Sequence, residues 1–193
     1  MKAPNRSGRP ESPYCVYASL ASGRIGSVPE SMRRLLLADN DVHLVGELDV
    51  LHGRRWLSRA VTGLMCLPRV GRHQRVRLSV IRRRGYELWQ RQFEDRAIST
   101  VQYLSDSLLA ERVGPIELLF EVDVNGGALL FTSTSAKLRL FNFGIRLPNL
   151  IAPVVCARMT SRSPDEIHTA VRIATRLTGE ILMYSGTMRE VSE

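Results

Sequence analysis

Apolar and polar residues alternate along much of this chain, with the period of two that is typical of β-strands. In residues 86–94, Glu87, Trp89, Arg91 and Phe93 share one face, and the residues between them share the other. Since that face has both Trp89 and Phe93, we predict that it points inward. An acid and a cation would then enter the interior, where a charge is costly unless it is paired or meets a ligand or water.

The same alternation predicts about nine strands, most of them joined by connections of hairpin length. These strands are residues 42–51, 74–83, 86–94, 116–124, 128–134, 136–143, 154–160, 168–176 and 180–188. Residues 98–104 and 106–112 are interpreted as short extended or partly helical pieces. The clearest turn is Asn125-Gly126-Gly127, because its glycines suit the left-handed conformations of a tight hairpin.

Two stretches have a helical period instead. Residues 29–38 begin with Pro29 and Glu30, residue types that favour the first turn of a helix, and they place their apolar residues on one face. Residues 56–65 repeat apolar residues at the i, i+3 and i+4 spacing and end before Pro68. Both helices are short, and both lie in the N-terminal half of the chain.

These elements predict a mainly β (α+β) fold: a strongly curved antiparallel sheet, or a closed barrel of about nine strands with two short helices. Closure is favoured because it removes exposed strand edges, and no alternation of strands and helices indicates a parallel sheet. A barrel of this size can enclose one small ligand. Residues 14–193 are expected to form this single domain, and the polar residues 1–13 a flexible tail.

Composition narrows the classes of partner. The net charge is +8, and all but two of the 27 Lys and Arg residues are arginine. The densest cluster of arginines flanks a predicted hairpin, where solvation explains it more simply than phosphate contact, and no nucleic-acid-binding motif accompanies it. No apolar run approaches the roughly 18 residues of a membrane span, and no secretion signal is present. We therefore expect a cytoplasmic protein with neither a nucleic-acid nor a membrane partner.

Metal and nucleophile chemistry find little support in the sequence. The three cysteines, Cys15, Cys66 and Cys156, form no CxxC pair and predict reduced thiols. The four histidines share no metal-ligand spacing, so no metal site is expected; they are His43, His52, His73 and His168. No GxSxG, P-loop or dinucleotide-binding GxGxxG motif occurs, and no cofactor is expected.

The face of residues 86–94 is therefore the main candidate site, with two readings left open. In one, Trp89 and Phe93 pack the core while Glu87 or Glu111 holds Arg91. In the other, the aromatics line a ligand site and Arg91 donates to a carbonyl, enolate or carboxylate. Arginine suits that role because it stays charged and offers a rigid fork of donors.

Acids and hydroxyls elsewhere in the chain complete the candidate site. Glu111 precedes the Gly114-Pro115 break and is either a solvated acid or arginine partner, or a general base. Tyr103 and Tyr184 are candidates to place hydroxyls inside the barrel. The predicted catalytic residues are accordingly Arg91, Glu111 and Tyr184, and the predicted substrate-binding residues are Trp89, Phe93, Glu87 and Tyr103.

Short motifs spread over residues 28–188 resemble an uncharacterised bacterial domain family. They are Val28-Pro29-Glu30-Ser31-Met32-Arg33, Gly46 with His52-Gly53, Leu67-Pro68 with Gly71, Trp89-x-Arg91-x-Phe93, Leu109-Ala110-Glu111-Arg112-x-Gly114-Pro115, Leu147-Pro148 with Pro153, and Tyr184-Ser185-Gly186. That family occurs alone or C-terminal to saccharopine-dehydrogenase-like NAD(P)-binding domains. The resemblance implies a shared fold but no established reaction.

Two functions remain in view for the predicted barrel. The leading hypothesis is a cofactor-independent cyclase or isomerase of secondary metabolism, which folds an apolar, polyketide-like metabolite into a reactive conformer. The alternative is a non-catalytic domain that binds a ligand or, as the resemblance implies, serves a separate dehydrogenase-type enzyme. A homodimer is compatible with either function. A nucleic-acid-binding module is a third hypothesis, supported by the charge alone.

Overall fold

A computed structural model describes residues 16–20, 27–64, 67–140 and 143–191. Their helices are α1 (Val16–Leu20), α2 (Glu30–Leu37) and α3 (Trp56–Leu64). Their strands are β1 (Val42–His52), β2 (Gly71–Arg83), β3 (Tyr86–Gln92), β4 (Ala97–Ser105), β5 (Leu108–Val113), β6 (Ile116–Asn125), β7 (Ala128–Leu140), β8 (Phe143–Arg146), β9 (Val154–Ser163), β10 (Glu166–Thr175) and β11 (Gly179–Glu190). The predicted tail, Cys15 and Cys66 lie outside the described residues.

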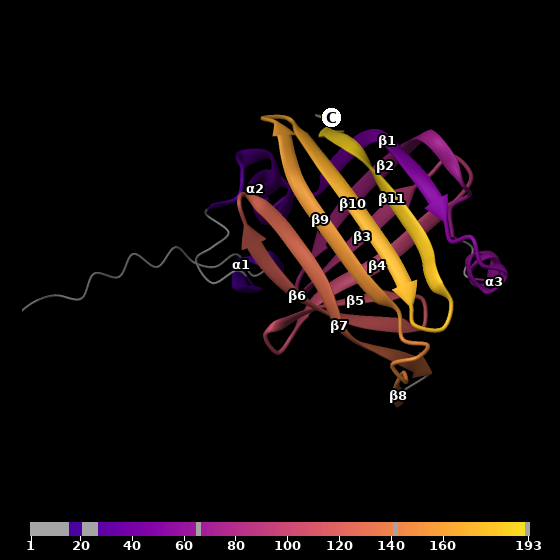
Figure 1. The fold of residues 1–193 in the computed structure, drawn as a ribbon. Coiled ribbons are helices and arrows are strands. Elements are labelled where there is room, and N and C mark those ends of the chain that lie inside the picture. The colour runs from indigo at the N-terminus through magenta and orange to yellow at the C-terminus, as the bar shows by residue number, and fades with distance from the viewer. Residues whose placement is uncertain (1–15, 21–26, 65–66, 141–142, 192–193) are drawn as a thin grey trace, which may run out of the picture.

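Ten of these strands close into an antiparallel barrel (Figure 1). The strands pair in sequence order from β1 to β7, β7 then pairs with β9, and β11 closes the barrel by pairing with β1. Within the described part of the chain, β8 pairs with β7 alone and stays outside the barrel. The predicted mainly β, closed architecture is confirmed, and closure leaves none of the ten barrel strands with an open edge.

The predicted strand boundaries are wrong in one region of the barrel wall. Residues 136–140 continue β7 instead of starting a new strand, because a bulge pairs Leu119 with Ser135 but Phe120 with Ser133. One extra residue at a bulge shifts the alternation, which makes one strand resemble two. Of the two alternatives left open for residues 98–104 and 106–112, the extended one is confirmed, because β4 and β5 are full strands without helical parts. The short helix α1 was not predicted.

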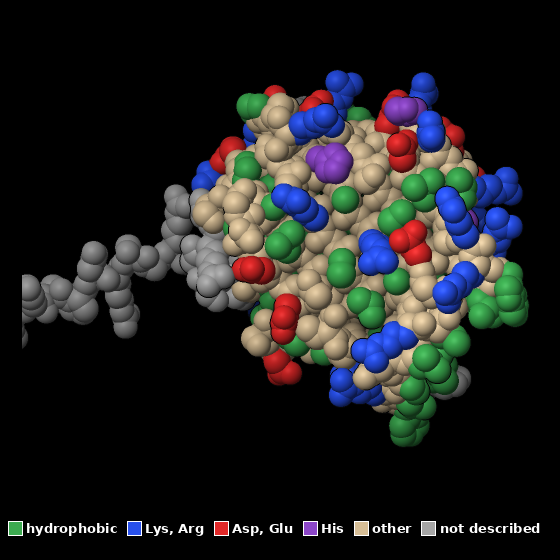
Figure 2. Space-filling view, viewed as in Figure 1, with side chains coloured by type: hydrophobic (Ala, Val, Ile, Leu, Met, Phe, Trp, Pro, Cys, Tyr) green, Lys and Arg blue, Asp and Glu red, His purple; other side chains and the backbone are tan. Residues whose placement is uncertain are grey.

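The connections between antiparallel strands gather at the two ends of the barrel. At one end, which we call the helical end, lie α1, α2 and the tight turn at Gly126 and Gly127, whose φ angles are 56° and 74°. At the other, which we call the open end, lie α3, β8 and the turn between β10 and β11 (Figure 1). Figure 2 shows hydrophobic side chains scattered singly over the wall of β7, β9, β10 and β11 but gathered at α3 and β8.

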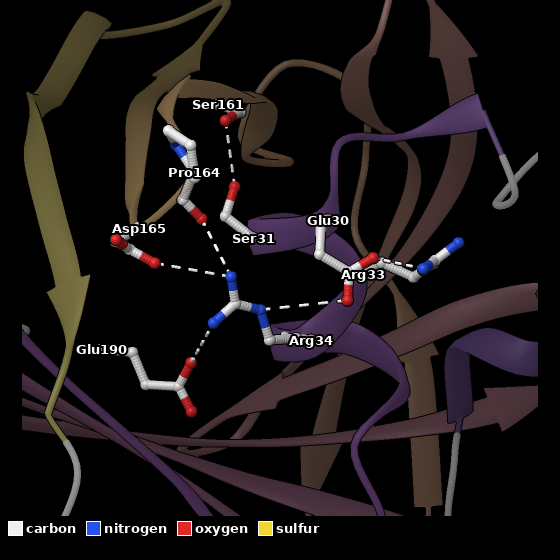
Figure 3. A network of polar contacts seen from close by, with 8 residues as sticks. All are labelled: Glu30, Ser31, Arg33, Arg34, Ser161, Pro164, Asp165 and Glu190. Atoms are coloured by element: carbon white, nitrogen blue, oxygen red, sulfur yellow. Dashed lines mark hydrogen bonds and ion pairs between the residues drawn. The ribbon is translucent and has the colours of Figure 1, made fainter.

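Helix α2 closes the helical end by inserting its apolar face into the barrel. Met32, Leu35 and Leu36, which share that face by helical spacing, are fully buried. On the outer side, Arg34 reaches the carbonyl oxygen of Pro164 at 3.2 Å and the carboxylates of Asp165 and Glu190, as Figure 3 shows. These contacts fasten α2 to the β9–β10 turn and to the end of β11.

The open end has a smaller apolar cluster and a less complete cover. Leu48, Val50, Val76, Phe93, Ile181 and Leu182 form this cluster inside the barrel. Helix α3 is joined to the rim by the Ser58 hydroxyl, which donates to the carbonyl oxygen of Glu180 at 2.6 Å. Among the described residues, no helix is long and apolar enough to cross a membrane.

Candidate ligand-binding site

A cavity of about 140 Å³ lies inside the barrel between the two apolar clusters. Its walls are mainly apolar and come from both halves of the barrel. The lining residues toward the helical end, such as Leu78 and Met188, are buried. Those toward the open end, such as Leu67, Val113 and Ile173, are only half-buried. The cavity therefore opens toward α3 and β8.

Arg91 brings a positive charge into this apolar space. The alternation of β3 directs Glu87, Trp89, Arg91 and Phe93 inward, and the Arg91 side chain is 17% exposed. Its Nη1 donates to the Thr100 hydroxyl at 3.3 Å, and its guanidinium lies 5.4 Å from the centre of the Trp89 ring, within cation–π range. Trp89 thus supports Arg91 from one side.

Glu111 provides the opposite charge. It comes from β5, its side chain is 16% exposed, and its Oε1 lies 3.9 Å from Nη1 of Arg91. That separation allows electrostatic attraction but exceeds hydrogen-bond length. Among the described residues, the hydrogen bond to Thr100 is the only one that the Arg91 guanidinium makes, although this group carries five N–H donors. Most of those donors remain available to a molecule in the cavity.

Tyr184 enters the same cavity from β11. Burial raises the pKa of its phenol; Arg91 opposes this shift and Glu111 adds to it, so Tyr184 keeps its proton at neutral pH. Burial lowers the pKa of Arg91, but interactions with Tyr184, Glu111 and Tyr17 outweigh it and raise that pKa overall. The cavity consequently holds a stable cation and a neutral phenol, both of which can donate to a ligand oxygen.

Four further polar residues of the cavity were not predicted: Tyr17, Thr100, Gln102 and Thr169. Tyr17 of α1 donates to Oε1 of Gln102 at 2.6 Å and packs edge-on against Phe131. Thr100 and Gln102 share a face of β4 with Ile98, but both faces of this segment mix apolar and polar residues, so the pattern did not show which face is inward. Tyr17 carried no signal either, since only the tertiary fold places α1 over the barrel.

Of the predicted site residues, Trp89, Arg91, Glu111 and Tyr184 line one cavity. Phe93 lies just beyond it, in the cluster at the open end, where its ring meets that of Tyr184 edge-on at 6.2 Å. Phe93 therefore positions Tyr184 rather than lining the cavity. Glu87 and Tyr103, both predicted to bind substrate, lie elsewhere.

Glu87 is a structural acid near the helical end. Its side chain is fully buried, accepts a hydrogen bond from Nε1 of Trp89 at 2.9 Å, and lies 3.6 Å from Nε of Arg82. Arg82 in turn donates to the carbonyl oxygens of Leu35 and Asn40 at the end of α2. Burial raises the pKa of Glu87, although the hydrogen bond from Trp89 and the charge of Arg82 oppose the shift. The acid is thus used to hold α2 and β3 together.

Tyr103 lies on the outer face of the barrel, because Thr100 and Gln102 take the inward positions of β4. Its hydroxyl donates to Glu117, a buried acid that also accepts from Nε of Arg139 at 2.7 Å. Burial raises the pKa of Glu117, but the hydrogen bonds from Arg139 and Tyr103 and the charges of Arg139 and Lys137 outweigh it, so the net shift is downward. This cluster braces β4, β6 and β7 from outside.

Cysteines and histidines do not add to the site in the described part of the chain. Cys156 is a free, exposed thiol. His52 contacts the carbonyl oxygen of Pro68, and His43 contacts the hydroxyl of Ser79. No three His, Cys, Asp or Glu side chains among the described residues lie together as metal ligands would.

Comparison with known proteins gives a family but no function. A family model described as "Domain of unknown function (DUF4166)" matches residues 29–188, which include nine strands of the barrel, most of β11, and both α2 and α3. No curated protein and no solved structure matches the chain.

Proposed function

Since the chain belongs to the DUF4166 family, whose function is unknown, we propose a function from the cavity itself: the barrel binds a small, mainly apolar molecule through one neutral carbonyl oxygen. The observation that carries this proposal is Arg91, a half-buried cation with spare donors in an apolar cavity. A guanidinium in such surroundings favours an oxygen ligand, because unpaired buried donors are costly.

The net charge of the polar residues in the cavity determines whether a neutral or an anionic oxygen ligand binds better. Arg91 and Glu111 together carry no net charge, so a carboxylate ligand would add an uncompensated buried charge. A ketone, lactone or amide oxygen adds none and can still accept from Arg91 and Tyr184. We therefore expect neutral carbonyl compounds to bind better than carboxylates of the same shape.

The volume of the cavity limits the part of the ligand that it encloses. Its 140 Å³ is close to the roughly 150 Å³ of an engineered protein cavity that accepts benzene. One ring or a short acyl segment fits inside, and the remainder of a larger ligand would extend toward the open end. A polyketide-like metabolite would thus enter by one end only.

Thermal unfolding with three ring compounds tests this binding. Cyclohexanone should raise the Tm of the protein, whereas cyclohexane should raise it less and benzoate should not raise it. The shift should disappear in the double variant Arg91→Met/Glu111→Leu and persist in the control Arg77→Met, which removes an outward-facing arginine of the adjacent strand β2. Equal shifts for cyclohexanone in both variants would contradict the proposal.

A second candidate function, cofactor-independent isomerisation or ring closure, is favoured by the convergence of Arg91, Glu111 and Tyr184 on one cavity. The Glu111 carboxylate would take a proton from the carbon next to the carbonyl, and the C–H electron pair would form the enolate double bond. Arg91 and Tyr184 would donate to the enolate oxygen. Return of the proton from Glu111 to another carbon completes an isomerisation. Alternatively, the enolate carbon attacks a second carbonyl of the same molecule, which closes a ring, and the alkoxide formed from that carbonyl takes the proton from Glu111.

Hydrogen exchange tests this chemistry without knowledge of the substrate. In D₂O, the protein should speed the exchange of the α-hydrogens of cyclohexanone, followed by NMR, above the rate in buffer. The variant Glu111→Gln should lose this acceleration, whereas Glu121→Gln, which changes an exposed acid of β6, should keep it. No acceleration by the wild-type protein would leave binding as the function.

A further inference from the structure

The open end of the barrel has a rim of exposed apolar side chains. Its six members, which we call the apolar rim, are Trp56 and Phe143 at 75% exposure, Ile145 at 59%, Leu150 at 54%, Leu140 at 48% and Leu177 at 44%. Large exposed apolar patches on a folded protein usually mark a binding surface. These residues come from α3, from β7 and β8, and from the turns next to them.

The members of the apolar rim are physically connected. The backbone N–H of Leu177, in the β10–β11 turn, donates to the carbonyl oxygen of Leu150 at 2.9 Å. On the other side of that turn, a Cβ atom at Gly179 would lie 3.9 Å from the Arg55 guanidinium, so the residue that precedes α3 lies beside the same turn. Figure 2 shows the hydrophobic side chains at α3 and at β8, with Lys and Arg side chains beside both groups.

Five exposed arginines accompany the rim: Arg54, Arg55, Arg59, Arg146 and Arg176. In the described ranges, no carboxylate lies within ion-pair distance of any of the five. Several acids at this end are already paired, as Asp95 is with Arg69 and Arg96, and Glu180 is with Arg172. At the helical end, by contrast, Arg34 pairs with three acids. The open end therefore carries five arginines whose charge no described acid compensates.

We propose that the open end docks on an anionic lipid surface. Exposed Trp and Phe side chains suit the boundary between lipid headgroups and acyl chains, and arginines suit lipid phosphates. A second copy of this chain is a poorer occupant, because a two-fold contact through this surface would bring the same five unpaired arginines together. A membrane surface supplies both the apolar layer and the negative charge.

Docking in this way would set the mouth of the cavity against the lipid. Leu67 lies three residues after the end of α3, and Ile173 precedes the β10–β11 turn, so the half-buried cavity residues lie beneath the rim. An apolar ligand could then pass between membrane and cavity without crossing water. Membrane docking stands without the proposed function, because the rim and its arginines lie outside the cavity.

Flotation of the full-length protein with vesicles tests the proposal. It should float with phosphatidylcholine vesicles that contain about one-third phosphatidylglycerol, and less with phosphatidylcholine alone. Raising NaCl from about 0.05 M to about 0.5 M should weaken binding, since this shortens the screening length. Trp56 emission should shift to the blue on binding, because the protein has two tryptophans and the other, Trp89, is 4% exposed.

Paired variants identify the surface that binds. Arg54→Gln/Arg146→Gln should lower partitioning about fivefold per arginine, and Trp56→Ser/Phe143→Ser about tenfold or more. The controls Arg162→Gln and Tyr86→Ser change exposed residues of the helical end and should bind as the wild type does. Binding that is equal on neutral and anionic vesicles, or unchanged in the rim variants, would refute the proposal. Dimerisation that Phe143→Ser abolishes, without vesicle binding, would assign the rim to a second copy and also refute it.

Discussion

The pairing of Arg91 with Glu111 predicts a strong energetic coupling inside the barrel. The two charges lie 3.9 Å apart, and their side chains are 17% and 16% exposed. At an effective dielectric constant of about 20, their attraction is about 4 kcal/mol. Desolvation of two ions costs several kcal/mol, so the pair contributes little net stability while each charge depends strongly on the other.

Removal of one charge should therefore be much more harmful than removal of both. We expect Arg91→Met and Glu111→Leu each to lower the free energy of unfolding by about 3 kcal/mol, because each leaves a buried charge without its partner. The double variant should lie within about 1 kcal/mol of the wild type, since Met and Leu can pack against the apolar lining. Met also keeps side-chain volume beside Trp89.

Urea unfolding followed by circular dichroism measures these free energies, and the double-mutant cycle gives a coupling energy that should exceed about 2 kcal/mol. Arg77→Met, on the outer face of β2, should change stability by no more than about 0.5 kcal/mol. If the effects of the single variants add to within about 0.5 kcal/mol, the two charges do not depend on each other, and the cavity must solvate them separately.

Further outcomes are expected for four single variants. Ala157→Leu fills part of the cavity, so it should abolish the Tm shift caused by cyclohexanone. The added side chain should stabilise the protein by at most about 2 kcal/mol. A retained Tm shift would place the ligand elsewhere. Glu111→Gln leaves the charge of Arg91 uncompensated, so benzoate should now bind better than cyclohexanone; an unchanged order of affinity would refute the charge argument. On acidification, Glu117→Gln should lose less stability than the wild type. The lowered pKa of Glu117 contributes to the free energy of unfolding above the unfolded pKa of about 4.3, and this contribution is lost as pH falls through the folded pKa. Glu87→Gln should lose more, because the raised pKa of Glu87 gives a contribution that is lost as pH rises above about 4.3. Urea unfolding between about pH 2 and 6 measures both effects, and variants that behave alike would contradict both signs.

The inward face of β3 was predictable because side-chain direction in a strand follows from the backbone alone. Once residues 86–94 are taken as a strand, Trp89 and Arg91 must share a face, and the closed fold makes that face internal. The hairpin at Gly126 was predictable for a different local reason. Its backbone needs positive φ angles, which glycine adopts at little cost.

Which of the predicted residues line the cavity depended on contacts between residues that are distant in the sequence. Glu87 and Arg91 share one face of one strand, yet Glu87 meets Arg82 and Trp89 while Arg91 meets Glu111 from another strand. Tyr103 is directed outward because Thr100 and Gln102 take the inward positions, and no local pattern in that weakly alternating segment fixed the choice. The alternation of each strand thus determined which residues could face the interior. Only closure of the barrel decided which residues became neighbours of those inward residues and how much space was left between them. It also produced the apolar, arginine-rich surface at the open end, because that surface depends on which strand ends and helices meet in space.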